Sequence, residues 1–285
     1  MKLVRWGEAG KEKPGIVDPH QQIRDASQLV DDWSAETLTA ENLQRLQATA
    51  LDLLPVVPAT TRLGPCVARP GKIVCVGLNY RDHAAEAGMA LPAEPILFLK
   101  VTSAITGPND PIVIPPLASK VDWEVELGVV IGQHGRNLTQ REALQHVAGY
   151  CVFNDVSERA WQIERGGQWD KGKNADTFAP LGPYLVTGDE IDDVQNLDLW
   201  LEVDGVRRQD SNTREMVFGV AELVAYISQF MSLHPGDIIA TGTPAGVGMG
   251  FKPPVYLKPG QQIRLGISGL GEQRNLLVAA GGTAR

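Results

Sequence analysis

Cysteine, aromatic residues and long apolar runs are all scarce in this chain of 285 residues. The three cysteines, Cys66, Cys75 and Cys151, are an odd number without a CxxC pair, so we expect no disulfide framework. No stretch approaches the roughly 18 apolar residues of a spanning helix, and the first 15 residues lack the apolar core of a signal peptide. The sequence therefore predicts a cytoplasmic protein that does not enter a membrane.

Positively charged residues are also fewer than negatively charged ones. Lys and Arg number 26 against 34 Asp and Glu, which gives a formal net charge of −8. A nucleic-acid or anionic-membrane surface would need the opposite balance, so neither partner is expected. Hydrophobic residues at 43% and charged residues at 21% are typical of a globular chain that can bury a sizeable core.

The pattern of apolar residues predicts two domains. Residues 1–65 form a small N-terminal module with strands near 2–7 and 15–18 and a helix that Thr39 caps and Pro55 ends. A proline-rich linker covers 55–70, and residues 66–285 form the second, larger domain.

Strands dominate this second domain. Two helices interrupt them: one begins at the Thr139–Glu142 capping box and ends at Gly149, and the other covers 217–231. Because the strands cluster instead of alternating with helices, we expect a mixed α+β fold, mainly β. The expected strands cover 73–77, 96–100, 111–115, 123–131, 150–153, 183–187, 197–203, 237–241 and 262–267.

Acidic and apolar residues alternate in the segment DWEVELGVVIG, residues 122–132. Residues two apart on a strand point to the same side, about 7 Å apart, so Glu124 and Glu126 can converge on one point. Carboxylate oxygens suit Mg²⁺, and Asp155, just after the predicted strand 150–153, is the candidate third ligand. On spacing alone, the two glutamates also fit the solvated face of an edge strand.

A second motif, GLNYRDHAAEAG at residues 77–88, predicts a turn that leads into a short helix. His83 and Glu86 lie three residues apart and share a helical face, so the carboxylate can orient the imidazole as a base toward water. An exposed helical histidine beside a glutamate is the plainer alternative.

Two further segments could contribute to a site. Residues 154–180 hold Arg159, Gln162 and Lys173, and basic groups beside a metal would serve an anionic substrate. The segment TGTPAGVGMG, residues 241–250, matches neither a P-loop nor GxGxxG. It is either a mobile loop whose amides and Thr243 hydroxyl approach a small ligand, or a surface turn.

Five ordered blocks together resemble the fumarylacetoacetate hydrolase family over roughly residues 72–278. The preceding segment KPGIVDPHQQIRD resembles the N-terminal domain of bacterial members that act on diketo sugar acids. The sequence departs from the family pattern at one place: the segment KGKNADTF stands where the family more usually has a KSF-type run after the lysine. The five blocks are GLNYRDHAAE, DWEVELGVVIG, GYCVFNDVSERAWQ, KGKNADTFAPLGP and DIIATGTPAGVG.

The resemblance implies a β-sandwich roll, a homodimer or higher homo-oligomer, and Mg²⁺ or Mn²⁺ held by Glu124, Glu126 and Asp155. It assigns His83 and Glu86 to water activation and Lys173 to catalysis. It places Tyr80, Arg159, Gln162 and Thr243 around the substrate.

The expected reaction is hydrolysis of the bond between carbons 3 and 4 of a 2,4-diketo acid. The first candidate substrate is 2,4-diketo-3-deoxy-L-rhamnonate, which would give pyruvate and L-lactate in sugar acid catabolism. Alternatives are decarboxylation of oxaloacetate or a related β-keto acid, isomerisation of a 2-oxo-dienoate, and a binding protein that has lost catalysis.

Overall fold

The computed structural model describes residues 1–281, and strands dominate it as predicted. Its largest sheet has nine strands in the order β3-β2-β1-β13-β10-β9-β16-β4-β5, so β9 lies in the interior of the sheet. Its strands are β1 (Lys2–Trp6), β2 (Lys13–Val17), β3 (Ile23–Asp25), β4 (Ile73–Gly77), β5 (Ile96–Lys100), β9 (Val125–Ile131), β10 (Val147–Asn154), β13 (Leu185–Thr187) and β16 (Ile238–Ala240).

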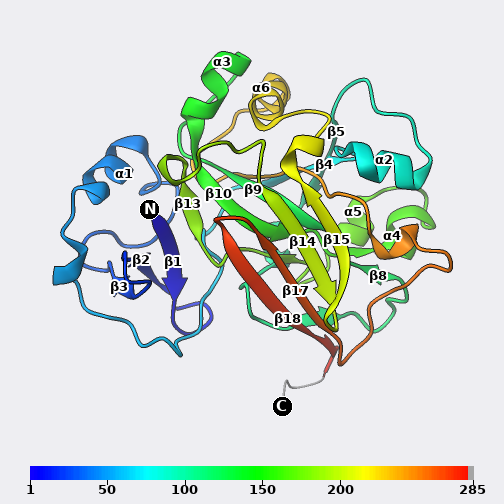
Figure 1. Cartoon of the computed structure of the whole chain (residues 1–285), viewed down its shortest axis with the longest axis horizontal. Coiled ribbons are helices and arrows are strands. Elements are labelled where there is room, and N and C mark those ends of the chain that lie inside the picture. Colours follow the sequence, from blue (N-terminus) through cyan, green and yellow to red (C-terminus); the bar gives the residue numbers. More distant parts are fainter. Residues whose placement is uncertain (282–285) are drawn as a thin grey trace.

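A second sheet of five strands, in the order β15-β14-β17-β18-β7, lies in front of β9 and β10 in Figure 1. Its strands are β7 (Ile112–Ile114), β14 (Asp198–Val203), β15 (Val206–Asn212), β17 (Gln262–Ile267) and β18 (Gly271–Ala279). Two short pairs complete the β structure: β6 (Ile105–Thr106) with β12 (Ala179–Pro180), and β8 (Val121–Asp122) with β11 (Ser157–Glu158).

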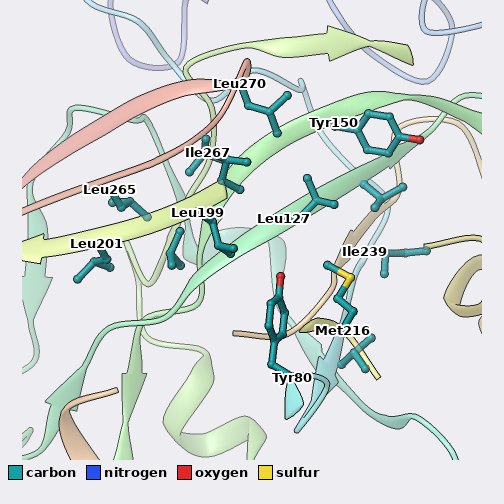
Figure 2. Packing of buried hydrophobic residues seen from close by; sticks show 14 of the residues in the cluster. Tyr80, Leu127, Tyr150, Leu199, Leu201, Met216, Ile239, Leu265, Ile267 and Leu270 are labelled. Atoms are coloured by element: carbon teal, nitrogen blue, oxygen red, sulfur yellow. The ribbon is translucent and has the colours of Figure 1, made fainter. Parts of the chain in front are cut away.

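Two apolar clusters cover the two faces of the large sheet. The first lies between the sheets and includes Leu127 of β9, Leu199 of β14 and Leu265 of β17 (Figure 2). The second includes Val130 of β9 together with Trp33 and Leu3 from the N-terminal segment. Strand β9 is therefore buried along its whole length, on both faces.

The N-terminal strands extend the large sheet, because β1 pairs antiparallel with β13. They lie on the left of Figure 1, beside α1. The domain boundary at residue 65 stays a prediction.

The helices are short: α1 (Ala40–Gln47), α2 (Arg81–Ala87), α3 (Gln140–Ala143), α4 (Arg159–Ile163), α5 (Asp170–Lys173) and α6 (Val220–Phe230). Within residues 1–281, none of them is long and apolar enough to cross a membrane.

Three predicted helices are shorter than expected, and one of them, predicted at 217–231, is α6 from Val220 to Phe230. Thr39 caps α1 as predicted, but the helix ends at Gln47, and Leu53 beyond it is exposed. The capping box of Thr139 and Glu142 is present, yet Val147 opens β10 instead of continuing α3. Gly149 is not a helix stop, because it lies within β10. A glycine is needed there because the strand packs closely on β13, where a Cβ would lie 2.2 Å from the Val186 carbonyl oxygen.

Candidate active site and metal centre

The three carboxylates predicted as metal ligands lie together in the structure. Glu124, Glu126 and Asp155 each offer an oxygen within 4.8 Å of the others, and all three side chains are buried. Glu126 lies on β9, Glu124 directly precedes that strand, and Asp155 follows the neighbouring β10. A hydrogen bond of 2.9 Å from the Asp155 amide to the Glu124 carbonyl joins the two strand ends. The alternative of a solvated edge strand is wrong, because β10 and β16 flank β9.

Three buried cations surround these acids. Lys173 Nζ donates to Glu124 Oε2 at 2.7 Å and to Asp155 Oδ2 at 2.8 Å. Arg159 Nη2 lies 2.7 Å from Glu124 Oε1, and Lys100 Nζ lies 2.7 Å from Asp155 Oδ1. Burial opposes ionisation of Glu124, but the charges of Lys173 and Arg159 outweigh it and lower the pKa of Glu124 to about 2. Glu124 is therefore ionised at neutral pH.

Glu126 has a different environment. Burial, and then the charges of Asp155 and Glu124, raise the pKa of Glu126 well above its ordinary value. Its one side-chain hydrogen bond within residues 1–281 comes from the amide of Gly242 at 2.8 Å, and no Lys or Arg of that range lies within 4.0 Å of its carboxylate. A buried carboxylate without a cation is unfavourable. Three convergent carboxylates with one left unpaired fit a divalent cation such as Mg²⁺ or Mn²⁺.

The pair of His83 and Glu86 lies on α2, which ends at Gly88 in the left-handed conformation, with φ of 65°. His83 Nδ1 lies 3.4 Å from Glu86 Oε2, and Glu86 also accepts a hydrogen bond of 3.0 Å from the Gly246 amide. Burial would raise the pKa of Glu86, but these two hydrogen bonds hold it below its ordinary value. Glu86 thus stays charged and anchors the imidazole to the 241–250 segment.

The surface-turn alternative for this segment is wrong, because residues 241–250 are largely buried and their amides bind carboxylates of this chain. The amides of Gly248 and Met249 donate to Asp122 at 2.6 and 3.0 Å, in addition to the Gly242 bond to Glu126. Thr243 Oγ1 donates to the Val125 carbonyl at 2.9 Å and accepts from Gln209 Nε2 at 2.8 Å. The hydroxyl proton of Thr243 is therefore already used within the protein.

One cavity of about 210 Å³ joins most of the predicted site residues. Its lining includes His83, Glu124, Glu126, Arg159, Gln162, Lys173 and Thr243. Arg159 reaches it from α4, where its Nε donates to Asp122 at 2.8 Å and its Nη1 donates to Gln162 Oε1 at 3.1 Å. Glu86 and Asp155 lie behind the lining and contact it through His83 and Lys173.

Tyr80 lies elsewhere. It is fully buried in the apolar cluster between the sheets, where Figure 2 shows it near Met216 and Leu127. Its hydroxyl has no hydrogen-bond partner among the described residues, and burial raises the pKa of Tyr80 well above the usual value. Tyr80 does not line the cavity, so its predicted contact with substrate finds no support in this geometry.

Sequence reasoning missed Lys100, Asp122 and the aromatic pair Phe98 and Trp169. Lys100 ends the apolar strand β5 and is only 2% exposed, although lysine is rarely buried unless paired. Such a lysine at the end of an apolar strand is a usable sequence signal. Asp122 stood out only as part of the acidic alternation, whereas the structure uses it to hold Arg159.

Comparisons with known proteins identify the family of this chain. The model of the fumarylacetoacetate (FAA) hydrolase C-terminal family matches residues 72–278. A protein of Burkholderia multivorans, whose provisional name says only that it is a hydrolase, is 61% identical over 281 residues, covering 98% of this chain and all of the relative.

Solved structures of similar proteins share the fold. The fumarylacetoacetate hydrolase of Exiguobacterium antarcticum has a TM-score of 0.86 at 36% identity, covering 98% of this chain and 99% of that one. The maleylpyruvate hydrolase of Sphingobium sp. SYK-6, in complex with manganese(II) and pyruvate, has a TM-score of 0.82 at 32% identity, with 98% and 99% coverage. The 2-hydroxyhepta-2,4-diene-1,7-dioate isomerase of Mycobacterium marinum has a TM-score of 0.78 at 33% identity, with 99% and 100% coverage. By the family match and the 61% identical relative, this chain belongs to the fumarylacetoacetate hydrolase family.

Proposed function

We propose that this chain is a hydrolase, dependent on Mg²⁺ or Mn²⁺, that cleaves the bond between carbons 3 and 4 of a 2,4-diketo acid. The observation that carries the proposal is one cavity lined by both His83 and the carboxylates Glu124 and Glu126. Hydrolysis of a chelating substrate needs a cation site and a base for water side by side. The likeness to a maleylpyruvate hydrolase crystallised with manganese(II) and pyruvate supports the same class.

Glu124, Glu126 and Asp155 are the residues that would hold the ion. When bound, the ion would supply Lewis acidity toward the 2-keto group of the substrate. Asp122, Glu124, Glu126 and Asp155 outnumber the buried cations Lys100, Arg159 and Lys173, so a divalent ion would make the site positive toward an anionic substrate.

The protein's own groups account for the proton transfers. His83, oriented by Glu86, takes a proton from water, and the water oxygen bonds to carbon 4. The bond between carbons 3 and 4 then breaks, and its electron pair stays on carbon 3 as the enolate of pyruvate. The proton that His83 accepted is transferred to carbon 3, which gives pyruvate. Carbon 4 becomes the carboxyl group of the second product, which loses its proton to the solvent.

Lys173 stabilises the negative charge that develops in this step. Burial would lower the pKa of Lys173, but the charges of Asp155 and Glu124 raise it above its ordinary value. Lys173 therefore remains an ammonium and acts as a fixed positive charge, not as a base.

The test is to treat the protein with chelator and supply a 2,4-diketo acid with and without Mg²⁺ or Mn²⁺. The first substrate to test is the acid predicted from sequence, 2,4-diketo-3-deoxy-L-rhamnonate. It should yield pyruvate and L-lactate only when metal is added. Pyruvate release without added metal would contradict the proposal. The predicted cytoplasmic location and homodimer stay predictions.

A second candidate is isomerisation of a 2-oxo-dienoate, favoured by the likeness to the isomerase of Mycobacterium marinum. An isomerase would return a product of unchanged mass. Release of CO₂ from oxaloacetate would instead identify a decarboxylase, and metal binding without any turnover would identify a binding protein.

A further inference from the structure

The cavity has a charged, buried floor and an apolar, exposed rim. On the floor, Glu124 is 5% exposed and Lys173 is 2% exposed. On the rim, Met89 is 56%, Ile163 is 49% and Met249 is 38% exposed. Large apolar side chains that stay exposed around a cavity mouth indicate a surface that a ligand covers.

An aromatic pair forms the wall between floor and rim. Phe98 and Trp169 pack edge to face with ring centroids 5.6 Å apart. Lys173 Nζ lies 5.0 Å from the centroid of Phe98, at the floor. Trp169 lies over Gly77, where an added Cβ would come within 2.6 Å of its ring, so this wall depends on a glycine in β4.

No free charge is available along this wall. Among the described residues, the cations that line the cavity are Arg159 and Lys173, apart from the imidazole of His83. Both already bind floor acids, Arg159 to Asp122 and Glu124 and Lys173 to Glu124 and Asp155. None of the rim side chains Met89, Ile163 and Met249 carries a charge, so a second carboxylate beside them would gain no ion-pair partner, whereas an apolar tail can pack on them.

We infer that the acyl end of the substrate is small, uncharged and apolar, and that it packs on the wall of Phe98 and Trp169. This inference rests on the proposed function, because it assumes that the head of the substrate, which is the carboxylate and the two keto groups of carbons 1 to 4, lies at the charged floor. The cavity of about 210 Å³ is smaller than the roughly 300 to 1,000 Å³ usual for ligand sites, so the acyl group is short. The inference ranks apolar acylpyruvates above both dicarboxylic and sugar-derived diketo acids.

The first test compares kcat/KM for three diketo acids with the same head. They are 2,4-dioxooctanoate, 2,4-dioxooctanedioate and 2,4-diketo-3-deoxy-L-rhamnonate, each with Mn²⁺. We expect the first to exceed the others by at least about 10-fold, because each buried methylene is worth roughly a fourfold gain. A preference for the dicarboxylic or the hydroxylated acid would overturn the inference while leaving the hydrolase proposal intact.

A binding measurement separates the two proposals if nothing is cleaved. Calorimetric titration of the Mn²⁺-loaded protein compares 2-oxooctanoate with 2-oxooctanedioate, and neither compound needs to react. Tighter binding of the monoacid, together with no cleavage of any of the three diketo acids, would remove the hydrolase proposal and keep the apolar wall. Equal or weaker binding of the monoacid would remove the apolar wall.

A charge placed on the rim should change the preference. Ile163→Lys puts an ammonium beside the cavity, so the ratio of kcat/KM for 2,4-dioxooctanedioate over 2,4-dioxooctanoate should rise about 10-fold. The matched control is Leu53→Lys, at a side chain 81% exposed outside the cavity lining, which should leave that ratio unchanged. Equal ratios in both variants would contradict a substrate tail at this rim.

Discussion

Lys173 Nζ and Glu124 Oε2 lie 2.7 Å apart, and both side chains are almost completely buried. The pair keeps Glu124 ionised and Lys173 protonated, but it leaves Glu126 without a cation. The charge imbalance of the site is therefore localised at one carboxylate. This asymmetry underlies the different outcomes expected for substitution of the two glutamates.

Replacing His83 with Ala should lower kcat by about 10² to 10⁴, because it removes the base that takes the proton from water. Binding of Mn²⁺, measured by calorimetric titration, should not change, since His83 is not among the three convergent carboxylates. Glu86→Gln keeps the imidazole and should give a smaller loss. Wild-type turnover in the His83 variant would refute its assignment as the base.

The isosteric variants Glu126→Gln and Glu124→Gln should differ in the metal-free protein. Glu126→Gln removes a carboxylate that Asp155 and Glu124 disfavour, so its Tm should equal or exceed that of the wild type. Glu124→Gln breaks a buried ion pair with Lys173 and Arg159 and should cost about 3 to 5 kcal/mol of stability, with a lower Tm. Both should weaken Mn²⁺ binding by at least about 10- to 100-fold. Melting curves recorded with chelator provide the check, and an equal loss of Tm in both variants would contradict the asymmetry.

Gly77→Ala should lower kcat/KM by up to about 100-fold with little change in Tm. The new Cβ would meet the Trp169 ring at 2.6 Å and push this side chain within the cavity. The matched control is Gly188→Ala, where nothing lies within 4 Å of the added atom. Steady-state kinetics and melting curves of both variants test this, and unaltered kinetics in Gly77→Ala would show that the position of Trp169 is unimportant.

Stability should depend on Glu12 in a defined pH range. Burial would raise the pKa of Glu12, but hydrogen bonds from Arg62 and the Gly10 amide and the charge of Arg5 hold it below its ordinary value of 4.5. Because the unfolded chain then binds more protons, the stabilisation is complete above pH 4.5 and is lost as the pH falls through the lower, folded-state pKa. The difference in Tm between wild type and Glu12→Gln should therefore shrink between pH 6 and pH 3. A constant difference would contradict this linkage.

The sequence predicts the acidic centre because a period of two residues is a local property. Alternation brings Glu124 and Glu126 to one side of the chain at the start of β9, and the end of β10 places Asp155 beside them. Alternation alone also fits a solvated edge strand, and the family resemblance is needed to choose the metal site. Burial of β9 on both faces is not local. It depends on β16, on the five-stranded sheet and on the N-terminal segment that contains Trp33.

Lys100 and Tyr80 illustrate the same limit. The partner of Lys100 is Asp155, more than 50 residues away, and the two meet only because β5 joins the large sheet through β4. Tyr80 lies in a site motif but directly precedes α2, where the chain forms an isolated bridge to Met216 that directs the ring into the core. The local sequence pattern does not show how α2 is rotated relative to the sheets. It therefore could not show that His83 lines the cavity while Tyr80 points into the core.

The central claim is tested most directly by mass analysis of the products formed in ¹⁸O-labelled water. Chelator-treated protein is supplied with 2,4-dioxooctanoate, with and without Mn²⁺. The account predicts pyruvate and pentanoate only with metal, and one ¹⁸O atom in the new carboxylate of pentanoate. Release of CO₂, a product of unchanged mass, or pentanoate without the label would contradict it.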